Sequence, residues 1–260
     1  QLATDLERDA ALLARLITME NGCPNAQSEA LQVQSAVALI RSLVDQASEF
    51  AFTEVRSGAR GGKVRIDRLP IGIALGIVPC NVPIFLACLK LATALLAGCP
   101  VVLKPSPENV DSMACFSRYL ARMDLPAGAV NLILGGRILG DHLVRNDVFR
   151  KVSFTGSSAS GLAVAQLCAQ RFARVTLELG GKSSAILLDD VDFTEVKDQL
   201  WLAMLQNNGQ VCGAQSRVLI PKSRAPELRA ALREMFEETV VGDPRLPETG
   251  VGPVVTAAAA

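Results

Sequence analysis

Residues 71–97 read IGIALGIVPCNVPIFLACLKLATALLA and contain the clearest strand-to-helix transition in the chain. Residues 71–78 form an apolar run of strand length, and residues 84–97 form one of helix length. The prolines between these runs fix φ and remove backbone donors, so they keep the two elements separate. A strand that is apolar throughout, instead of alternating with polar residues, predicts burial on both faces of a sheet.

The same order of strand and helix repeats towards the carboxyl terminus. Further apolar runs of strand length are expected at 101–104, 130–134, 152–155 and 175–179. Segments of helix length lie between them at 110–123, 138–145 and 158–172. Helical crossovers between buried strands favour parallel pairing, so the sequence predicts an α/β fold with a Rossmann-like, doubly wound parallel sheet. Such sheets bind ligands beyond the carboxyl ends of their strands.

The regions on either side of this core predict two further parts. Apolar residues recur at helical spacing over the first 56 residues, with a break at Gly22-Cys23-Pro24-Asn25, and a glycine- and arginine-rich turn follows at 58–63. Beyond residue 180 we expect strands at 185–188 and 217–220 and helices at 193–206 and 225–240. The sequence thus predicts two domains. Residues 1–180 combine the amino-terminal helices with the sheet, and residues 181–260 begin a second α/β domain.

The charge balance excludes several classes of partner. Basic and acidic residues number 26 each, so a net charge of zero favours neither nucleic acid nor an anionic membrane. Residues 70–89 carry no charge, but the prolines at 79 and 83 interrupt a membrane-spanning helix and Lys90 ends the run. Residues 1–9 are acidic, so no signal peptide is visible. Because the sequence does not begin with methionine, we expect that residues precede Gln1.

Cysteine usage and the single histidine limit the chemistry. The seven cysteines are odd in number and contain no C-x-x-C motif, so they predict neither disulfides nor a zinc site, and a reducing cytoplasm is expected. Cysteines that lie in apolar stretches are interpreted as small hydrophobes: Cys88, Cys99, Cys115 and Cys168. His142 lies among charged residues and is interpreted as solvated. A reactive cysteine or a carboxylate with a shifted pKa is therefore the expected catalytic group.

Several predicted strands end in residues that suit ligand binding. Asn81 lies between the two prolines, where a polar side chain needs partners, although capping of the next helix carries equal weight. Lys104 ends a strand and suits hydroxyl or phosphate recognition, although many such lysines are only solvated. Residues 154–161, FTGSSASG, lead into a helix whose free N–H groups favour a phosphate. This is not a P-loop, because Leu162 and Ala163 replace the required Lys and Ser/Thr.

A glutamate and a cysteine complete the candidate set. Glu178 stands between two leucines at a strand end, and an apolar surrounding raises the pKa of a carboxyl group towards that of a general base. The alternative is an exposed glutamate on an edge strand. Cys212 lies in the polar, glycine-flanked loop NNGQVCGA at 207–214, which suits a thiolate that needs access and backbone donors. The alternative is an ordinary loop cysteine.

Taken in order, these segments resemble the NAD(P)-dependent aldehyde dehydrogenase superfamily over nearly the whole chain. The specific signatures are ELGGK at 178–182 and GQVC at 209–212, together with the interval between them. The resemblance implies oxidation of an aldehyde to a carboxylic acid through a thiohemiacetal and a thioester on Cys212. Asn81 and the Cys212 backbone N–H would hold the oxyanion, and Glu178 would activate the hydrolytic water. It also implies a homodimer or homotetramer of the full-length protein.

The resemblance further implies a site for NAD or NADP. Lys104 would bind the adenine ribose hydroxyls, and Ser157 with the Gly156 turn would face the pyrophosphate. The other residues assigned to the cofactor are Gly136 and Gly140 at the adenine end, and Val78, Pro79, Phe154, Thr155 and Leu179 towards the nicotinamide. Candidates for an apolar aldehyde channel are Phe85, Trp201 and Leu205.

Three departures from the family pattern qualify these expectations. Cys80 stands before the oxyanion asparagine, where an aromatic residue is usual. Pro107 replaces the acidic residue of many NAD-preferring members, which removes a repulsion against a 2′-phosphate and makes NADP plausible. The family's catalytic domain extends beyond Ala260, so residues 181–260 are expected to be only its first part.

Two rival functions stay open on the sequence alone. A non-catalytic remnant that binds a nucleotide or another subunit fits a truncated chain, whereas the retention of Cys212, Glu178 and Asn81 argues against decay. A CoA-acylating dehydrogenase would pass the acyl group to a thiol instead of water. Relatives of that kind usually lack the glutamate base, so Glu178 favours hydrolysis.

Overall fold

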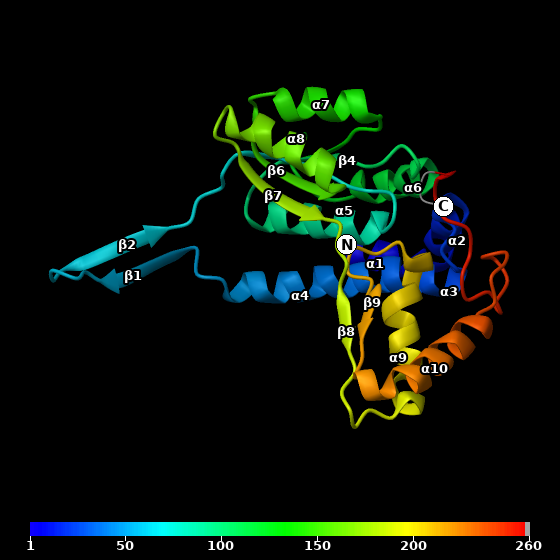
Figure 1. Cartoon of the computed structure of the whole chain (residues 1–260). Helices are drawn as coiled ribbons and strands as arrows, with labels where there is room; N and C mark the ends of the chain where they lie inside the picture. Colours follow the sequence, from blue (N-terminus) through cyan, green and yellow to red (C-terminus); the bar gives the residue numbers. More distant parts are fainter. Residues whose placement is uncertain (258–260) are drawn as a thin grey trace.

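The computed structural model describes residues 1–257 and centres on a five-stranded parallel sheet (Figure 1). Its strands are β3 (Ile73–Ile77), β4 (Val101–Lys104), β5 (Val130–Leu132), β6 (Phe149–Gly156) and β7 (Arg174–Leu179). They lie in the order β5-β4-β3-β6-β7. The predicted doubly wound sheet is confirmed, and its winding direction reverses between β3 and β6.

Helices cover both faces of this sheet, as its apolar strands require. They are α5 (Pro83–Leu96), α6 (Val110–Leu120), α7 (Arg137–Arg145) and α8 (Ser158–Ala169). In Figure 1, α7 and α8 lie above the sheet and α5 lies below it. Successive side chains of a strand point to opposite faces. Ala74 of β3 accordingly packs in the cluster that includes α5 and α6, and Leu75 packs in the cluster that includes α7 and α8.

The amino-terminal helices form a further layer on α5 and α6. They are α1 (Leu2–Arg8), α2 (Ala10–Asn21), α3 (Asn25–Ser28), the π-helical turn η1 (Glu29–Gln34) and α4 (Ser35–Glu49). Leu6, Leu13 and Ile17 are fully buried in the cluster that α5 and α6 share. The predicted break is confirmed, because Gly22 ends α2 in the left-handed conformation (φ 77°) that favours glycine.

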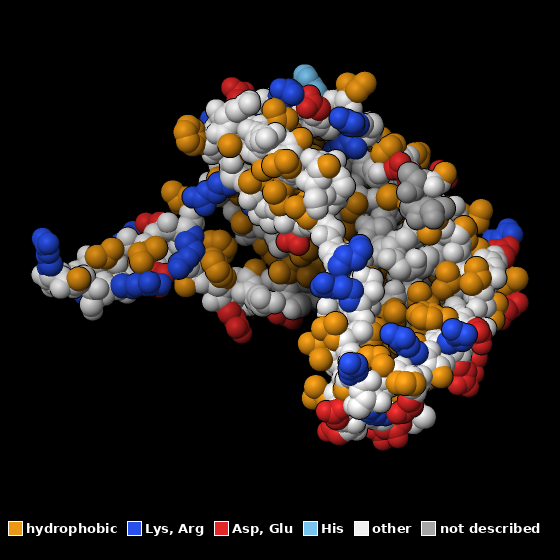
Figure 2. Space-filling view, viewed as in Figure 1, with side chains coloured by type: hydrophobic (Ala, Val, Ile, Leu, Met, Phe, Trp, Pro, Cys, Tyr) orange, Lys and Arg blue, Asp and Glu red, His pale blue; other side chains and the backbone are white. Residues whose placement is uncertain are grey.

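Residues 53–67 form a projecting hairpin, so the expectation of helix up to residue 56 is wrong. Strand β1 (Thr53–Ser57) pairs antiparallel with β2 (Lys63–Asp67) across the predicted turn (Figure 1). Thr53 and Val55 favour strands because their side chains branch at Cβ. Figure 2 shows basic, acidic and apolar side chains interspersed over the hairpin. It is therefore held by its ladder and by surface ion pairs, such as Arg56–Glu54, instead of a buried core.

A smaller sheet and two helices follow the large sheet. Strand β8 (Ser184–Ile186) pairs parallel with β9 (Arg217–Leu219), beside α9 (Phe193–Leu205) and α10 (Ala225–Glu237). Two short 3₁₀ turns, η2 (Gln206–Gly209) and η3 (Lys222–Arg224), precede β9 and α10 respectively. These elements share their own apolar cluster, which includes Phe193, Leu200 and Leu228. The strands and helices expected after residue 180 are thus confirmed.

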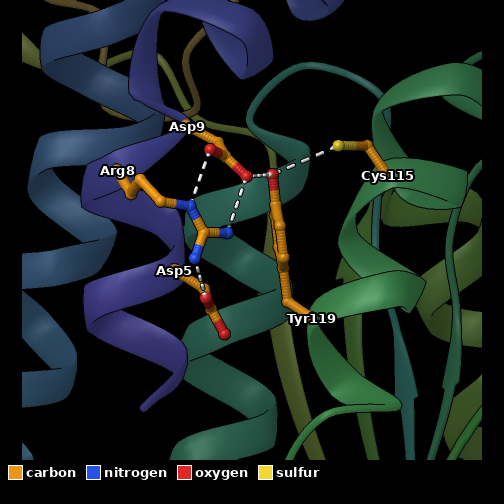
Figure 3. A network of polar contacts seen from close by, with 5 residues as sticks. All are labelled: Asp5, Arg8, Asp9, Cys115 and Tyr119. Atoms are coloured by element: carbon orange, nitrogen blue, oxygen red, sulfur yellow. Dashed lines mark hydrogen bonds and ion pairs between the residues drawn. The ribbon is translucent and has the colours of Figure 1, made fainter.

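Tyr119 fastens α6 to the junction of α1 and α2 (Figure 3). Its hydroxyl donates to Asp9 Oδ2 at 2.9 Å, and Cys115 Sγ lies 3.2 Å from the same hydroxyl. The Arg8 guanidinium bonds both Asp9 oxygens and pairs with Asp5 at 2.6 Å. Hydrogen bonds from Arg8 and from Tyr119 hold the pKa of Asp9 at about 2. This network stabilises the packing of the amino-terminal helices.

Among residues 1–257, no helix combines the length and apolar character needed to cross a membrane. All seven cysteines are free thiols. The same residues contain no group of three His, Cys, Asp or Glu side chains arranged to bind a metal ion.

Candidate active site

A cleft of about 940 Å³ opens at the carboxyl ends of β3, β6 and β7. The winding of the sheet reverses between β3 and β6, and ligands of doubly wound sheets bind at such a reversal. Segments far apart in the sequence line the cleft: the loop after β3, the start of α8, the end of β7 with residues 180–182, and the loop 209–212. These segments bring Asn81, Glu178 and Cys212 to one cavity, as their motifs predicted.

Asn81 lies in a rigid loop between β3 and α5. Pro79 precedes it, and Pro83 is the first residue of α5. The Asn81 side-chain amide donates one N–H to the carbonyl of Gln210 at 2.6 Å. The helix-capping alternative is wrong, because the N-cap of α5 is Val82 and no side chain caps this end. An asparagine amide carries two N–H donors, so the bond to Gln210 leaves one for another acceptor.

The backbone carbonyl of Asn81 is held by three other side-chain amides. Asn21, Gln32 and Asn207 donate to it at 2.9, 3.0 and 2.9 Å respectively. All three donors are fully buried. The Gln210 side chain completes the connection by donating to the Asn21 carbonyl at 3.2 Å. Elements from the amino terminus therefore join the Asn81 loop to the loop that carries the cysteine.

Cys212 is the one exposed cysteine of the seven. Its loop begins where Asn207 and Asn208 adopt left-handed φ angles of 54° and 60°, a conformation that asparagine tolerates better than most residues. The resulting sharp turn at the end of α9 carries the chain back to the cleft. Burial raises the pKa of the Cys23 thiol to about 11, and it also raises the pKa of Cys80, which lines the same cleft.

Glu178 lies on the edge strand β7, opposite Thr155 of β6. Its side chain is exposed, so the prediction of an apolar surrounding is wrong. In its accessibility, Glu178 matches the alternative of an exposed glutamate on an edge strand. The flanking leucines point to the other face of the strand because side chains alternate. Among residues 1–257, the Glu178 carboxylate has no hydrogen-bond partner. No hydrogen bond within the described residues therefore fixes its orientation.

Lys90 of α5 is a buried charge beside the cleft that the motifs did not single out. Its ammonium donates to Thr155 Oγ1 at 2.8 Å and to Ser153 Oγ at 3.0 Å. Burial lowers the pKa of Lys90 to about 8, although the negative charge of Glu178 opposes that shift. The only sequence signal was the position of one lysine within an otherwise apolar helix. We interpreted that lysine as the end of an uncharged run.

Lys104 is the residue that was predicted to bind the adenine ribose of the cofactor. This side chain is buried at the end of β4, and burial lowers its pKa while the nearby Glu108 carboxylate opposes the shift. A side chain at Gly140 would contact the Lys104 stem at 3.9 Å, and no atom lies within 4 Å of one built at Gly136. The Lys104 stem thus lies close to Gly140 of α7, and the space beside Gly136 is open.

The start of α8 is built to accept an anion. Ser157 is its N-cap, and the Ser157 hydroxyl accepts the Ser160 N–H at 3.2 Å, which leaves earlier N–H groups of the helix free. Gly156 carries no side chain because a Cβ there would lie 2.7 Å from the Phe154 ring.

The structure does not bring every predicted site residue into the cleft. Pro79, Thr155 and Leu179 line it. Val78 and Phe154 are buried and do not line it, and neither do Lys104, Gly136 and Gly140. Phe85 also lines the cleft. Trp201 does not, because its indole N–H donates to Thr239 Oγ1 at 2.8 Å and its ring packs against the cluster around α9.

The family model described as "Aldehyde dehydrogenase family" matches residues 1–260. The chain belongs to the aldehyde dehydrogenase family. Among curated relatives, geranial dehydrogenase from Castellaniella defragrans is 36% identical over 99% of this chain. A crystal structure of PnpE in complex with nicotinamide adenine dinucleotide superimposes with a TM-score of 0.92 at 30% identity, over 99% of this chain and 53% of PnpE. An NADP-dependent enzyme from E. coli superimposes with a TM-score of 0.93 at 27% identity, over 99% of this chain and 54% of that one.

This aldehyde dehydrogenase chain spans about half the length of the curated relatives it matches, including 54% of geranial dehydrogenase. The family signatures were visible in the sequence because they are contiguous. The amides around Asn81 were not, since Asn21 and Gln32 lie in helices whose sequence carries no family motif.

Proposed function

We propose that the protein containing this chain oxidises an aldehyde to a carboxylic acid with NAD or NADP, and that Cys212 is the nucleophile. One observation carries the proposal: Asn81, Glu178 and Cys212 come from separate segments and line a single cleft. Family membership supports it. So does the complex of the related PnpE with nicotinamide adenine dinucleotide.

The first step needs an accessible thiolate and a donor for the oxyanion. The Cys212 thiolate attacks the aldehyde carbon, a C–S bond forms, and the carbonyl π-electron pair moves to oxygen. The second N–H of the Asn81 amide, together with the Cys212 backbone N–H, stabilises this negative charge. A single donor of this kind contributes about 3–4 kcal/mol to such a transition state. Because Gln210 already holds the first N–H of Asn81, the amide is oriented before the substrate arrives.

The cofactor site consists of Lys104, Gly136, Gly140 and the start of α8 at Ser157, with Thr155 and Leu179 on the nicotinamide side. The bound nicotinamide supplies a hydride acceptor. The protein's own contribution is to orient the reacting carbon and to exclude bulk water from it. Pro107 and the proximity of Glu108 to Lys104 leave both NAD and NADP as candidates.

Hydrolysis of the resulting thioester is assigned to Glu178. Its carboxylate accepts a proton from water as the water oxygen attacks the acyl carbon. The C–S bond then breaks, the carboxylic acid leaves, and the Cys212 thiolate is restored. The exposure of Glu178 supports this role, because the base must reach both the acyl group and solvent. The negative charge of Glu178 acts on the Lys90 ammonium, so Lys90 is a candidate to assist proton movement.

Several finer proposals accompany this function. We propose that residues 1–180 form the cofactor-binding domain and that residues 181–260 belong to the catalytic domain, which the separate apolar cluster around α9 and α10 supports. The full-length enzyme is proposed to act in the cytoplasm as a homodimer or homotetramer. The substrate is an aldehyde with an apolar chain, which the position of Phe85 in the cleft supports.

The test is an aldehyde panel with the purified full-length protein, with NAD and NADP supplied separately. We expect NADH or NADPH to form together with one equivalent of carboxylic acid, identified by mass spectrometry. Product that requires CoA and appears as acyl-CoA would favour the CoA-acylating rival. Cofactor binding without any reduction across the panel would favour the non-catalytic rival.

A further inference from the structure

We propose that Gln32, Asn21 and Asn207 form an amide cradle whose task is to position Asn81 for oxyanion binding. The inference rests on the proposed aldehyde oxidation and assigns positioning residues that no sequence motif indicates. Gln32 is the most informative member. It lies in the π-helical turn η1, far from the nucleophile in sequence, and within residues 1–257 its side chain makes a single hydrogen bond, to the Asn81 carbonyl.

The cradle concentrates three donors on one acceptor. The carbonyl oxygen of Asn81 accepts side-chain N–H groups from Asn21, Gln32 and Asn207, all at 2.9–3.0 Å. A carbonyl oxygen has only two lone pairs, so three donors are more than it needs to satisfy its hydrogen-bonding capacity. The third donor adds little hydrogen-bond energy, but it restrains the peptide plane from a third direction.

Two of the three donor amides have a side-chain oxygen without a hydrogen-bond partner. Among residues 1–257, Gln32 Oε1 and Asn207 Oδ1 are buried and have no hydrogen-bond partner. Buried polar atoms of native proteins almost always have partners, and exceptions call for an explanation. An apolar side chain of similar size would avoid this penalty at position 32. The presence of an amide there is explained if its N–H is needed to hold the Asn81 carbonyl.

The restrained peptide sets the direction of the catalytic amide. The Asn81 side chain leaves from the Cα next to the held carbonyl, and its Nδ2 donates to the Gln210 carbonyl at 2.6 Å. The Gln210 side chain is fixed in turn, because its Nε2 donates to Asn21 O and its Oε1 accepts the Val255 N–H at 2.8 Å. Asn21 therefore contacts both the loop of Asn81 and the loop of Cys212. The cradle fixes the separation between oxyanion donor and nucleophile.

A positioning role and a purely structural role of Gln32 predict different effects of its loss. A loss of support would disturb Cys212 and the cofactor site as well as Asn81. A loss of positioning would slow only the step in which an oxyanion forms, because misplacement of a reacting group by about 1 Å costs about 100-fold in rate. Alkylation of Cys212 by iodoacetamide is a useful reference, since this displacement forms no oxyanion.

The experiment compares Gln32→Met and Gln32→Glu with the wild type in the full-length enzyme. The readouts are the pre-steady-state burst of NAD(P)H, the KM for aldehyde, the Kd for cofactor and the iodoacetamide rate at Cys212. For Gln32→Met we expect a burst at least about 10-fold slower, with the alkylation rate and cofactor Kd within about twofold of wild type. Gln46→Met is the matched control, because Gln46 lies on the exposed face of α4 and bonds only Ser42. It should leave all four values unchanged.

Gln32→Glu adds a signature that a structural role does not produce. A protonated glutamic acid can still donate to the Asn81 carbonyl, whereas the carboxylate repels it. The burst rate of Gln32→Glu should therefore fall as the pH rises, and that of Gln32→Met should keep the pH profile of the wild type. This comparison also serves if Gln32→Met does not fold.

Two results would overturn the cradle. One is a burst rate equal to wild type in a folded Gln32 variant. The other is a parallel loss of burst, alkylation and cofactor binding, which would mean general disruption. A wild-type enzyme that gives no burst with any aldehyde would instead refute the proposed function, so the two failures are distinguishable.

Discussion

The two sides of the cleft are built in opposite ways. On one side, the Asn81 carbonyl is held by buried amides from the amino-terminal helices and from η2, and Asn21 also contacts the loop of Cys212. On the other, Glu178 stands exposed on an edge strand without a hydrogen-bond partner among the described residues. The first arrangement suits a charge that must be stabilised without reorganisation. The second suits a base that acts later and has to move between water and the acyl group.

The largest expected effect is that of Cys212→Ala. Removal of the nucleophile should lower kcat/KM for aldehyde oxidation by at least about three orders of magnitude, since no other cysteine of the chain is exposed. Steady-state NAD(P)H formation measures it, with Cys80→Ala as the control from the same cleft. If Cys80→Ala removed activity and Cys212→Ala did not, the assignment of the nucleophile would be wrong.

Glu178→Gln distinguishes the early step, thioester formation, from the later step, thioester hydrolysis. Loss of the general base should slow steady-state turnover by about 10²–10⁴-fold, while the first turnover still releases a burst of NAD(P)H. Stopped-flow absorbance measures both phases in one trace. A proportional loss of burst and steady state would show that Glu178 acts before thioester formation, and the contrast between an early and a late side would fail.

Asn81→Ala tests the preorganised side. Loss of one oxyanion donor should reduce the burst rate by about 10²–10³-fold, with little change in the Kd for cofactor. Asn131→Ala is a suitable control, because Asn131 is exposed and donates only to the Gly128 carbonyl. An unchanged burst in Asn81→Ala would mean that the amide bonds around it serve the fold alone.

Lys90→Met tests the buried ammonium group that interacts with Glu178. Burial lowers the pKa of Lys90 in the folded protein to about 8, from an ordinary value of 10.5. Between these values the unfolded chain binds more protons, so the stability of the wild type rises with pH in this window. Relative to Lys90→Met, the wild type should gain up to about 3 kcal/mol between pH 8 and 10.5. Urea unfolding at both pH values measures this gain, and an equal pH dependence in both proteins would contradict it.

Tyr119→Phe should have the smallest effect, and it should affect neither side of the cleft. It removes the hydrogen bond to the Asp9 carboxylate, which contributes about 1–2 kcal/mol to stability. Because Tyr119 does not line the cleft, kcat and KM should stay unchanged. A loss of activity without a loss of stability would reveal a connection between this network and the active site.

The sequence predicted the parts of the molecule whose signal is local. Strand β4 lies at the predicted residues, because a short apolar run between breakers has few alternatives. The hairpin at 53–67 was missed since it has no apolar face and continues directly from an amphipathic helix. The expected burial of Glu178 failed for a related reason: neighbouring leucines in a strand point away from it.

The site was predictable only where chemistry coincides with a contiguous motif. Cys212, Glu178 and Asn81, which line the cleft, were singled out in this way. The amides of Asn21 and Gln32 could not be found, because their significance depends on a three-dimensional meeting with the Asn81 carbonyl. Lys90 carried a weak signal, a single charge inside an apolar helix.

The most direct test of the account is the order in which the seven cysteines react with iodoacetamide in the unliganded, full-length enzyme. Peptide mapping by mass spectrometry would follow each thiol while NAD(P)H formation is measured on the same samples. The account predicts that Cys212 is modified first and that activity falls in step with its modification. Equal rates at all seven cysteines, or full activity after complete modification of Cys212, would contradict it.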